Sequence, residues 1–368
     1  MKRFLVVLCL SILLAPAARA SENLTVAAKG AVLIDGASGR VLFGQNENAQ
    51  YPMASTTKVM TTLLALERSQ PDEAVTAGKN AAGVTGTSMY LSEGETLSME
   101  HMLYGLMLRS GNDAAVAVAE HIAGSVPAFA ELMNARAAEL DADAHFVNPH
   151  GLDADGHRTS ALGLARIMRE AMKNPAFRAI TATKRKVVPW VGNEYSRVLE
   201  NKNRLLTTYE GATGGKTGFT NKAGRCLVFS AEREGLELIG AVLNCPTWFD
   251  TATVMLDYGF DHFRLERAWD ADAVVRAVPV VNGAAEAVNA VAAQSLQAAV
   301  PIGGSVDVAV SLPATLDAPV RRGDVLGTAS IKTGGDVIAT CDLVAASDVE
   351  KVSLRAAFAR LLRQWLFW

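Results

Sequence analysis

Apolar and polar residues follow two spacings along the first part of the chain, one typical of strands and one typical of helices. Residues 31–44 predict two strands around a Gly-Ser turn. Residues 97–124 predict two helices that break around Ser110, with Ser98 as the N-cap of the first. Between residues 160 and 175, apolar side chains recur every three or four positions, which predicts a further helix.

The pattern changes twice further along the chain. After about residue 222 it predicts strands and then a helix near residues 249–258. Because helices and strands mix without regular alternation up to about residue 263, we expect an α+β domain there. Past Trp269, short β-branched runs are separated by Gly and Pro, which is typical of a small all-β domain.

The first twenty residues have the pattern of an export signal. Two basic residues precede an apolar run over residues 4–14, and the triplet Ala-Arg-Ala at 18–20 provides a small-residue cleavage site. The run is shorter than the roughly 20 apolar residues that a membrane-spanning helix needs. We therefore expect export, with a mature chain that begins at Ser21.

The last stretch, residues 348–368, places apolar and polar side chains on opposite faces of a predicted helix. The polar face carries Arg360, Arg363 and Gln364, and the apolar face carries Leu354, Phe358, Leu361, Leu362, Trp365 and Trp368. A Trp/Phe/Leu face opposite an arginine face suits a helix that lies in the plane of a membrane interface. A terminal helix docked on the protein itself is the alternative.

Composition and charge exclude some classes of protein. The formal net charge of −3 does not suggest the basic patch that a nucleic acid would need. Only Cys226, Cys245 and Cys341 follow the leader, which is too few for a disulfide scaffold. Cys226 and Cys245 flank a predicted hairpin, so a cross-strand bridge and a pair of buried thiols both fit the sequence.

One short segment, residues 51–67, carries candidate chemistry. Its sequence, YPMASTTKVMTTLLALE, places Ser55 three residues before Lys58 at the start of an apolar helix. Side chains three residues apart lie on one face of a helix, so we expect the hydroxyl and the amine to touch. A neutral lysine there can act as the base that makes the serine a nucleophile. Alone, the pair also fits a helix start followed by a solvated lysine.

Two further triplets favour the catalytic interpretation. The chain carries Ser110-Gly111-Asn112 and then Lys216-Thr217-Gly218. The ordered set S-x-x-K, S-x-N and K-T-G is the signature of penicillin-recognising serine enzymes. A second K-T-G at residues 332–334 lies between two β runs, and we interpret it as a hairpin turn. Lys216 instead follows GATGG and opens a strand with which a substrate backbone could pair.

The motifs and their surroundings resemble the low-molecular-weight penicillin-binding proteins, specifically the serine-type D-alanyl-D-alanine carboxypeptidases. The segments YPMASTTKVMT, LMLRSGNDAA, FVNPHGLDADGH and GGKTGFTNKAGRCLV look like stretches of that family, and the resemblance runs from Ala31 to the C-terminus. It implies an α+β fold, a penicillin-recognising serine transpeptidase-like domain with an antiparallel sheet and helices. A small all-β domain and a C-terminal amphipathic helix would follow.

The organisation that we expect is a signal peptide at residues 1–20, a serine D-Ala-D-Ala peptidase domain at 21–263, a small β-rich domain at 264–347 and an amphipathic membrane-anchoring helix at 348–368. The resemblance implies an exported enzyme, peripheral on the periplasmic face of the cytoplasmic membrane. Its implied partners are the peptidoglycan stem peptide, β-lactam antibiotics as inhibitors and the membrane surface through the terminal helix. It implies no cofactor, no metal and no nucleic acid.

The resemblance also implies roles for the motif residues. Ser55 attacks the carbonyl between two D-alanines to form an acyl-enzyme, Lys58 takes its proton, and Ser110 relays a proton to the departing D-alanine. The backbone N–H groups of Ser55 and Phe219 form the oxyanion hole, and water then hydrolyses the ester. Lys216 is the cation that keeps Lys58 neutral. The residues expected to bind substrate are Asn112 at its amide, Thr217 and Thr220 at its carboxylate, and Lys216, Gly218 and Phe219.

The chain departs from the family in one segment. Some relatives carry an arginine downstream of the K-T-G strand that helps to bind the substrate carboxylate. Here that segment reads NCPTWFDTATVML and contains no arginine. We therefore expect carboxylate binding to rest on Thr217 and Lys216.

Three rival interpretations stay open. A class A β-lactamase would use a glutamate in an E-x-x-x-N pattern, and Glu170 has that spacing but falls on the polar side of a predicted helix. A metal peptidase would draw on the Asp and His residues of segment 141–157, which lacks the H-E-x-x-H pattern. A wall-binding relative without turnover is the third, and the intact Ser55, Lys58 and Lys216 argue against it.

Overall fold

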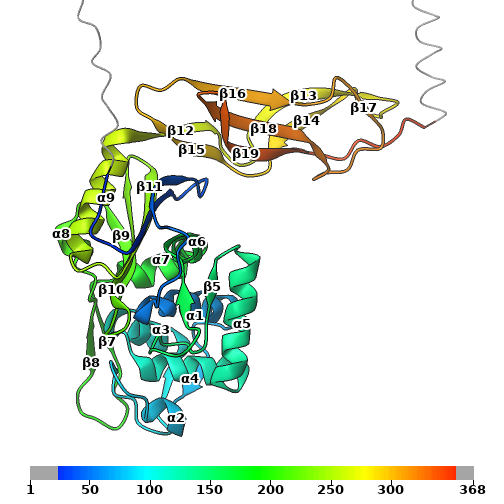
Figure 1. Ribbon diagram of the computed structural model, residues 1–368. Coiled ribbons are helices and arrows are strands. Elements are labelled where there is room, and N and C mark those ends of the chain that lie inside the picture. The colour runs from blue at the N-terminus through cyan, green and yellow to red at the C-terminus, as the bar shows by residue number, and fades with distance from the viewer. Residues whose placement is uncertain (1–23, 354–368) are drawn as a thin grey trace, which may run out of the picture.

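The computed structural model describes residues 24–353, and Figure 1 shows their arrangement. The predicted signal peptide at residues 1–20 lies outside the described residues, as does the part of the predicted terminal helix at 354–368. Residues 348–353 are not helical. Val349 and Lys351 form isolated β-bridges with Val320 and Gly283, and these bridges hold the segment against the small domain. A helix of the predicted kind would therefore begin after this segment.

A five-stranded antiparallel sheet, in the order β2-β1-β11-β10-β9, forms one layer of the larger domain. Its strands are β1 (Gly30–Asp35), β2 (Val41–Gln45), β9 (Ala212–Thr220), β10 (Gly224–Arg233) and β11 (Leu236–Leu243). The two strands predicted within residues 31–44 are β1 and β2, which confirms that prediction. β9 is an edge strand, since within the described chain it pairs only with β10.

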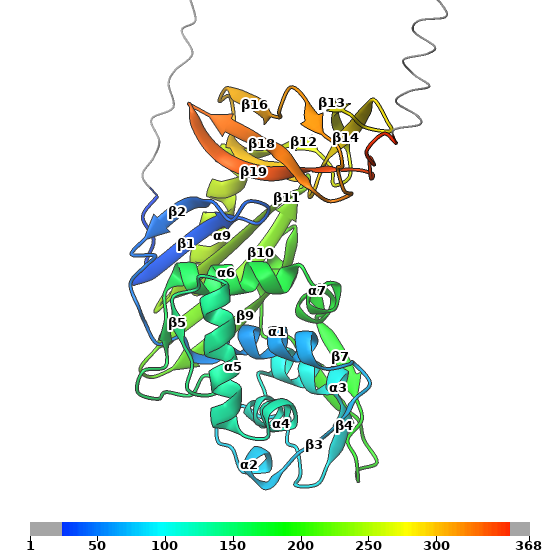
Figure 2. The same ribbon diagram turned by 90° about the vertical axis from the view of Figure 1, so that its right-hand side faces the viewer.

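Both faces of this sheet are covered by helices (Figure 2). α6 (Ala161–Met172) packs against β1 and β11 on one face, and α9 (Trp248–His262) packs against β10 and β11 on the other. Side chains of a strand alternate between faces, so Val32 and Ile34 join the core around α6, while Ala31 and Leu33 join the core around α9. Burial on both faces explains the continuous apolar run of β1.

The helical layer surrounds α1, whose first eight residues are all buried. The structure contains the break predicted at Ser110. It also contains the helices predicted at residues 160–175 and 249–258. Ser98 caps α3, as predicted, because its hydroxyl accepts from the His101 N–H at 3.3 Å. The helical elements are η1 (Ala54–Thr57), α1 (Lys58–Arg68), α2 (Lys79–Ala82), α3 (Met99–Tyr104), η2 (Gly105–Arg109), α4 (Asn112–Ala123), α5 (Val126–Glu139), α6 (Ala161–Met172), α7 (Pro175–Ala182), α8 (Leu205–Thr208) and α9 (Trp248–His262).

Three short strand pairs lie outside the main sheet. They are β3 (Ala74–Thr76) with β4 (Thr96–Ser98), β5 (Ala144–His145) with β6 (Arg158–Thr159), and β7 (Arg185–Val188) with β8 (Arg197–Glu200). Figure 1 shows β7 and β8 as a hairpin that runs along the side of the helical layer.

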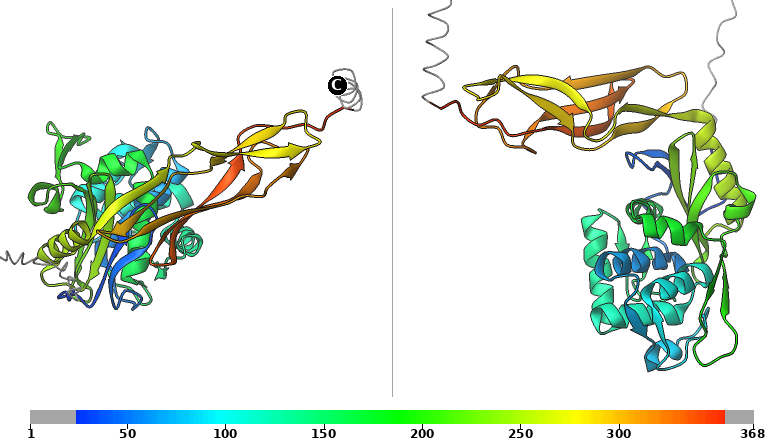
Figure 3. Two further views of the ribbon diagram at one scale, coloured as in Figure 1. Left: turned by 90° about the horizontal axis from the view of Figure 1, so that it is seen from above. Right: turned by 180° about the vertical axis from the view of Figure 1, so that it is seen from behind.

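After α9, the described residues 263–353 form a separate all-β unit with its own core, in which small and β-branched side chains predominate. A six-stranded sheet in the order β16-β18-β19-β14-β13-β17 packs with the pair β12 and β15. The strands are β12 (Phe263–Trp269), β13 (Val274–Val281), β14 (Ala287–Ala292), β15 (Leu296–Pro301), β16 (Val306–Ser311), β17 (Leu316–Asp317), β18 (Val325–Thr333) and β19 (Asp336–Ala345). Figure 3 shows that this unit extends sideways from the larger domain and that the described chain ends at its far tip.

A buried carboxylate joins the two units. Asp35, at the end of β1, accepts hydrogen bonds from two N–H groups of its own turn, at Ala37 and Ser38, and from the N–H of Ala299 in β15 at 2.9 Å. Arg40, on the same turn, donates to the Ala299 carbonyl at 2.6 Å. The turn between β1 and β2 therefore holds one residue of the small unit by both its backbone groups.

Within residues 24–353, no single helix has the length and apolar character to cross a membrane. The bent pair of α4 and α5, at 84° to each other, passes that test on length and composition only when the two helices are taken together.

Candidate active site

The nucleophile candidate lies in a short turn at the start of the central helix. Ala54–Thr57 forms the 3-10 turn η1, and α1 follows directly. The turn is held from two sides: the Thr57 hydroxyl donates to the Ala54 carbonyl at 2.8 Å, and Nε2 of the buried His157 lies 2.8 Å from the same hydroxyl. Ser55 Oγ and Lys58 Nζ come within 3.1 Å of each other.

Lys58 is fully buried and surrounded by acceptors. Its Nζ donates to Asn112 Oδ1 at 2.7 Å and to the His150 carbonyl at 2.5 Å. Burial and then the charge of Lys216 hold the pKa of Lys58 well below its ordinary value. A neutral amine has two N–H bonds and one lone pair. The two carbonyl oxygens use both N–H bonds, so the lone pair is left for the Ser55 hydroxyl, which is the arrangement that a general base requires.

Ser110 reaches the site through a break in the helical layer. η2 ends at Arg109, the next residue Ser110 has a φ of 64° in the left-handed region, and α4 begins at Asn112. The Thr87 hydroxyl donates to the Ser110 carbonyl at 2.5 Å and fixes the break. The side chain of Ser110 thereby lines the same cavity as Ser55.

Asn112 uses both sides of its amide within the protein. Its Oδ1 accepts from Lys58, and its Nδ2 donates to the Thr85 carbonyl at 2.7 Å. These contacts use one of the two lone pairs of Oδ1 and one of the two N–H bonds of Nδ2, so Asn112, which lines the cavity, keeps an acceptor and a donor for the expected contact with a substrate amide. In the described state Asn112 orients the base.

The edge strand β9 brings the third motif against the nucleophile. Lys216 is almost fully buried, and its Nζ donates to the Thr217 carbonyl at 3.0 Å. Burial and then the charge of Lys202 lower the pKa of Lys216 to about 7. A Cβ at Gly218 would lie only 2.8 Å from the Ser55 backbone nitrogen, so glycine is what allows β9 to approach η1 this closely.

A cavity of about 400 Å³ lies where these elements meet. From the predicted set it is lined by Ser55, Ser110, Asn112, Thr217, Gly218, Phe219 and Thr220. Lys58 and Lys216 stand behind this lining, one under Ser55 and one beside Thr217. Segments far apart in the sequence therefore meet at one cavity, and all nine predicted residues lie in its wall or directly behind it.

Sequence reasoning missed part of the cavity wall. Lys202 and Trp248 line it, as do Gly86–Thr87 and Gly151–Leu152. Gly151–Leu152 fell inside a segment that resembles the family, but the other three had no motif of their own. Trp248 stands in the segment NCPTWFDTATVML, which contains no arginine, so an aromatic residue occupies that part of the wall.

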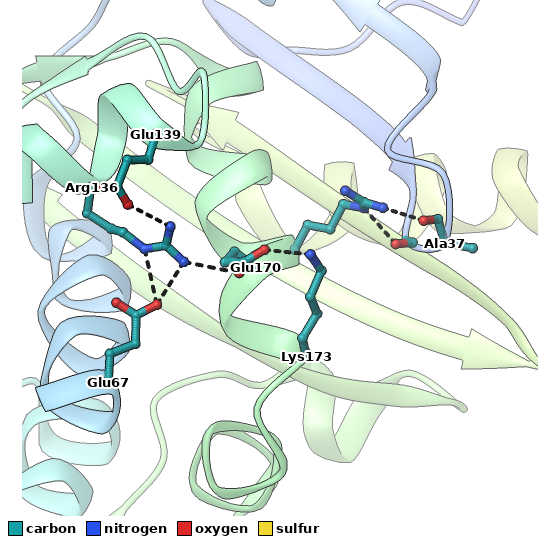
Figure 4. A network of polar contacts seen from close by, with 8 residues as sticks. Ala37, Glu67, Arg136, Glu139, Glu170 and Lys173 are labelled. Carbon is teal, nitrogen blue, oxygen red and sulfur yellow. Dashed lines mark hydrogen bonds and ion pairs between the residues drawn. The ribbon is translucent and has the colours of Figure 1, made fainter. Parts of the chain in front are cut away.

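The glutamate considered for a β-lactamase is engaged elsewhere. Figure 4 shows Glu170 on α6 in a network with Arg136 and Lys173, and Arg136 also reaches Glu67 on α1 and Glu139 on α5. Glu170 does not line the cavity at Ser55. The helix position predicted for Glu170 is confirmed, but its carboxylate is ion-paired and connects α6 to α5 through Arg136, where the sequence predicted a solvated side chain.

The metal site considered for segment 141–157 is not present in the described chain. Within residues 24–353, no three His, Cys, Asp or Glu side chains gather as metal ligands. The second K-T-G, at residues 332–334, lies at a hairpin turn, as predicted: Lys332 and Thr333 end β18, and Gly334 and Gly335 connect it to β19. Cys226, Cys245 and Cys341 are free and buried, so the pair that flanks the hairpin is not bridged.

Comparisons with known proteins agree with this geometry. Residues 17–247 match the family described as D-alanyl-D-alanine carboxypeptidase, and residues 263–351 match the C-terminal domain of penicillin-binding protein 5. The chain belongs to the D-alanyl-D-alanine carboxypeptidase family. This membership confirms the expected family and the α+β class with a small all-β domain, and it does not favour a β-lactamase or a binder without turnover.

Individual members of the family match over nearly their whole length. D-alanyl-D-alanine carboxypeptidase DacF of Bacillus subtilis is 31% identical, with 99% of each chain covered. DacC of Escherichia coli is 31% identical over 92% of this chain and 89% of its own. The structure of penicillin binding protein 5 from Haemophilus influenzae superposes with a TM-score of 0.76 at 30% identity, covering 89% of this chain and 98% of that one.

Proposed function

We propose that the protein is a serine D,D-carboxypeptidase that removes the terminal D-alanine from peptidoglycan pentapeptide stems through an acyl-enzyme on Ser55. The observation that carries this proposal is the placement of Lys58: a fully buried amine, its pKa lowered by burial, with its lone pair left free for the Ser55 hydroxyl. Family membership supports the substrate class.

The reaction begins at the Ser55 hydroxyl. Lys58 takes the proton while Oγ attacks the carbonyl between the two D-alanines, and the negative charge that forms on the carbonyl oxygen is received by the backbone N–H groups of Ser55 and Phe219. The close approach of Gly218 to the Ser55 nitrogen supports this pairing of donors. Ser110 passes a proton to the leaving D-alanine nitrogen, and water then releases the shortened peptide from Ser55.

We also propose that the enzyme is exported and acts on the periplasmic face of the cytoplasmic membrane, with its C-terminal helix on the membrane surface. The leader-like sequence at residues 1–20 and the apolar and basic faces of residues 348–368 support this location. The described chain ends at the far tip of the small unit (Figure 3), so an anchor that follows it would keep the catalytic domain away from the lipid. Removing residues 354–368 should release the enzyme from anionic vesicles without changing its peptidase activity.

Three measurements on the full mature chain test the peptidase proposal: the mass of the protein after penicillin treatment, the release of D-alanine from a pentapeptide, and the rate of penicillin hydrolysis. Intact mass spectrometry after treatment with penicillin should show one adduct on the wild type and none on Ser55→Ala. A pentapeptide should release D-alanine with the wild type only. An adduct on the variant would mean that another residue is the nucleophile, labelling without D-alanine release would indicate a binder, and fast hydrolysis of penicillin would indicate a lactamase.

A further inference from the structure

Three lysines gather at the cavity beside Ser55: Lys202 lines it, and Lys58 and Lys216 stand behind its wall. Lys58, Lys216 and Lys202 are close enough to influence one another electrostatically, and Arg109 adds its charge to that of Lys202. No Asp or Glu is among the described residues that line the cavity. Such a site favours an anionic ligand, and a peptide with a free C-terminus supplies one carboxylate.

The positions expected to bind that carboxylate supply less charge than the sequence suggested. Lys216 is only 2% exposed, does not line the cavity, and already donates to the Thr217 carbonyl. With a pKa of about 7, it is also only partly protonated at neutral pH. Thr217 does line the cavity, but a hydroxyl is a neutral donor.

The segment NCPTWFDTATVML contains no lysine or arginine, so it offers no cation for the carboxylate. Trp248 lines the cavity there. Arg225 contacts the ring of Trp248, with its guanidinium carbon 5.9 Å from the ring centroid, and donates to the Pro246 carbonyl at 2.7 Å. Arg225 does not line the cavity, so its charge is used outside the site.

Among the described residues that line the cavity, Lys202 is the one lysine or arginine. It lines the cavity together with Ser55 and Thr217. Among the residues that the structure describes, its ammonium has no hydrogen bond or ion-pair partner, whereas Lys58 and Lys216 both do. An ammonium that faces a cavity without acids can receive a ligand carboxylate and need not break a protein contact to do so.

The two neighbours of Lys202 hold it in place. The Asn201 amide donates to the carbonyls of Thr181 and Thr183 at 3.1 and 3.0 Å. The buried Asn203 amide donates to the Gly214 carbonyl of β9 at 3.1 Å. Lys202 thus projects from a segment that is fastened both to the helical layer and to the strand that carries Lys216, which gives its side chain a fixed origin beside the cavity.

We propose that Lys202, together with Thr217, binds the terminal carboxylate of the substrate. This inference rests on the proposed carboxypeptidase function, because it assigns a residue to the substrate of that reaction. The same position would receive the carboxylate of a penicillin.

The test compares Lys202→Met with the wild type on two forms of one acylating agent, benzylpenicillin and its methyl ester. The ester keeps the reactive ring but lacks the negative charge. We expect the second-order acylation rate with benzylpenicillin to fall about 10- to 100-fold in Lys202→Met, since a charge-assisted hydrogen bond is lost. The rate with the methyl ester should change little. Lys202→Arg should restore most of the rate with the acid, and KM for the peptide should rise more than kcat falls.

Lys222→Met is the matched control, since Lys222 is an exposed lysine in the turn after β9 that does not line the cavity. It should react like the wild type with both compounds. If Lys202→Met loses acylation rate equally with acid and ester, the residue only supports the structure. If Lys202→Met loses no rate with the acid, the inference is overturned. The same holds if Lys222→Met shows the same selective loss of rate with the acid. A wild type that neither compound acylates would instead refute the proposed function, and this inference with it.

Discussion

Ser55 Oγ lies 3.1 Å from Lys58 Nζ at the buried start of α1, and the other two directions around that nitrogen are taken by the Asn112 side chain and the His150 carbonyl. The two acceptors come from residues 54 and 92 positions away from Lys58. They decide which way the lone pair of a neutral lysine points. The reactivity of Ser55 therefore depends on the packing of three separate segments as well as on the local S-x-x-K spacing.

Replacing Lys58 by methionine should remove the base and leave the shape of the site nearly unchanged. We expect acylation of Ser55 by penicillin to slow by about 10²- to 10⁴-fold, the usual contribution of a general base. Stopped-flow labelling with a fluorescent penicillin measures the rate, and circular dichroism checks that the variant is folded. Lys222→Met serves as the control for loss of one exposed lysine. A Lys58→Met variant that keeps most of its acylation rate would show that another group takes the Ser55 proton.

The buried Lys216 should make stability depend on pH. Its pKa is about 7 in the folded chain and near 10.5 when it is exposed, so between these values the unfolded chain binds the extra proton. The free energy of unfolding therefore rises with pH across this window, and below it the full penalty of burying the charge is present. Lys216→Met removes this penalty. The difference in the free energy of unfolding between the variant and the wild type should therefore favour the variant more at acidic pH than at basic pH.

Urea unfolding of the wild type and Lys216→Met measures this effect. Between about pH 6.5 and about pH 9, the advantage of the variant in the free energy of unfolding should shrink by about 2 kcal/mol. Lys222→Met should differ from the wild type by the same amount at both pH values, because its side chain is exposed. A constant difference for Lys216→Met would mean that Lys216 keeps an ordinary pKa in the fold.

Short-range signals are sufficient to predict much of the fold and the three motifs. The β1–β2 pair, the cap at Ser98 and the break at Ser110 all depend on neighbours within a few residues, and the structure contains each of them. Local sequence also distinguishes the two K-T-G triplets. The copy at residues 332–334 stands next to turn residues between two β runs, which predicts the hairpin turn that the structure contains.

Several features of the site depend on contacts that a local pattern does not contain. The His150 carbonyl that orients Lys58 is a backbone group with no side-chain signal. Lys202 reaches the cavity because Asn203 is fastened to β9, which only the folded chain shows. α5 (Val126–Glu139) was not predicted, although Ser125 at its start accepts from the Ala128 N–H as an N-cap. In that case a local signal is present in the sequence, since a serine stands directly before the helix.

Gly151 is expected to be essential for the position of Ser55. Its φ is +89°, and a Cβ at this position would lie 2.0 Å from the carbonyl oxygen of Ala54, the residue before the nucleophile. Gly192 in the β7–β8 hairpin has a similar φ of +81°, but a Cβ there would meet open space, with nothing within 4 Å. The pair of glycine-to-alanine variants therefore separates the backbone penalty from the steric clash.

We expect Gly192→Ala to lower the free energy of unfolding by about 1 kcal/mol, the penalty for a side chain in the left-handed region. Gly151→Ala should lower it by several times that amount, about 3 kcal/mol or more, because the Ala54 carbonyl must move. Only Gly151→Ala should also slow acylation by penicillin. Urea unfolding and the labelling rate measure the two effects, and equal losses in both variants would disprove the role of the clash.

Asp35 should control how firmly the two units are joined. It is fully buried, and of its hydrogen bonds only the one from the Ala299 N–H crosses to the small unit. In Asp35→Asn, one carboxylate oxygen becomes an NH₂ group that faces N–H donors, which removes acceptors and costs about 1–3 kcal/mol. Ser38→Ala is the control, since it removes a hydroxyl that donates to Asp35 and accepts from the Arg40 N–H within the turn, and it leaves the contact with Ala299 in place.

The expected result is faster trypsin cleavage in Asp35→Asn after Arg264 and Arg267, which lie in β12 where the chain enters the small unit. Release of D-alanine from a short peptide should be the same as in the wild type, because Asp35 does not line the cavity at Ser55. Ser38→Ala should be cleaved at nearly the wild-type rate. If both variants are cleaved equally fast, the turn as a whole, rather than the bond between Asp35 and Ala299, joins the units.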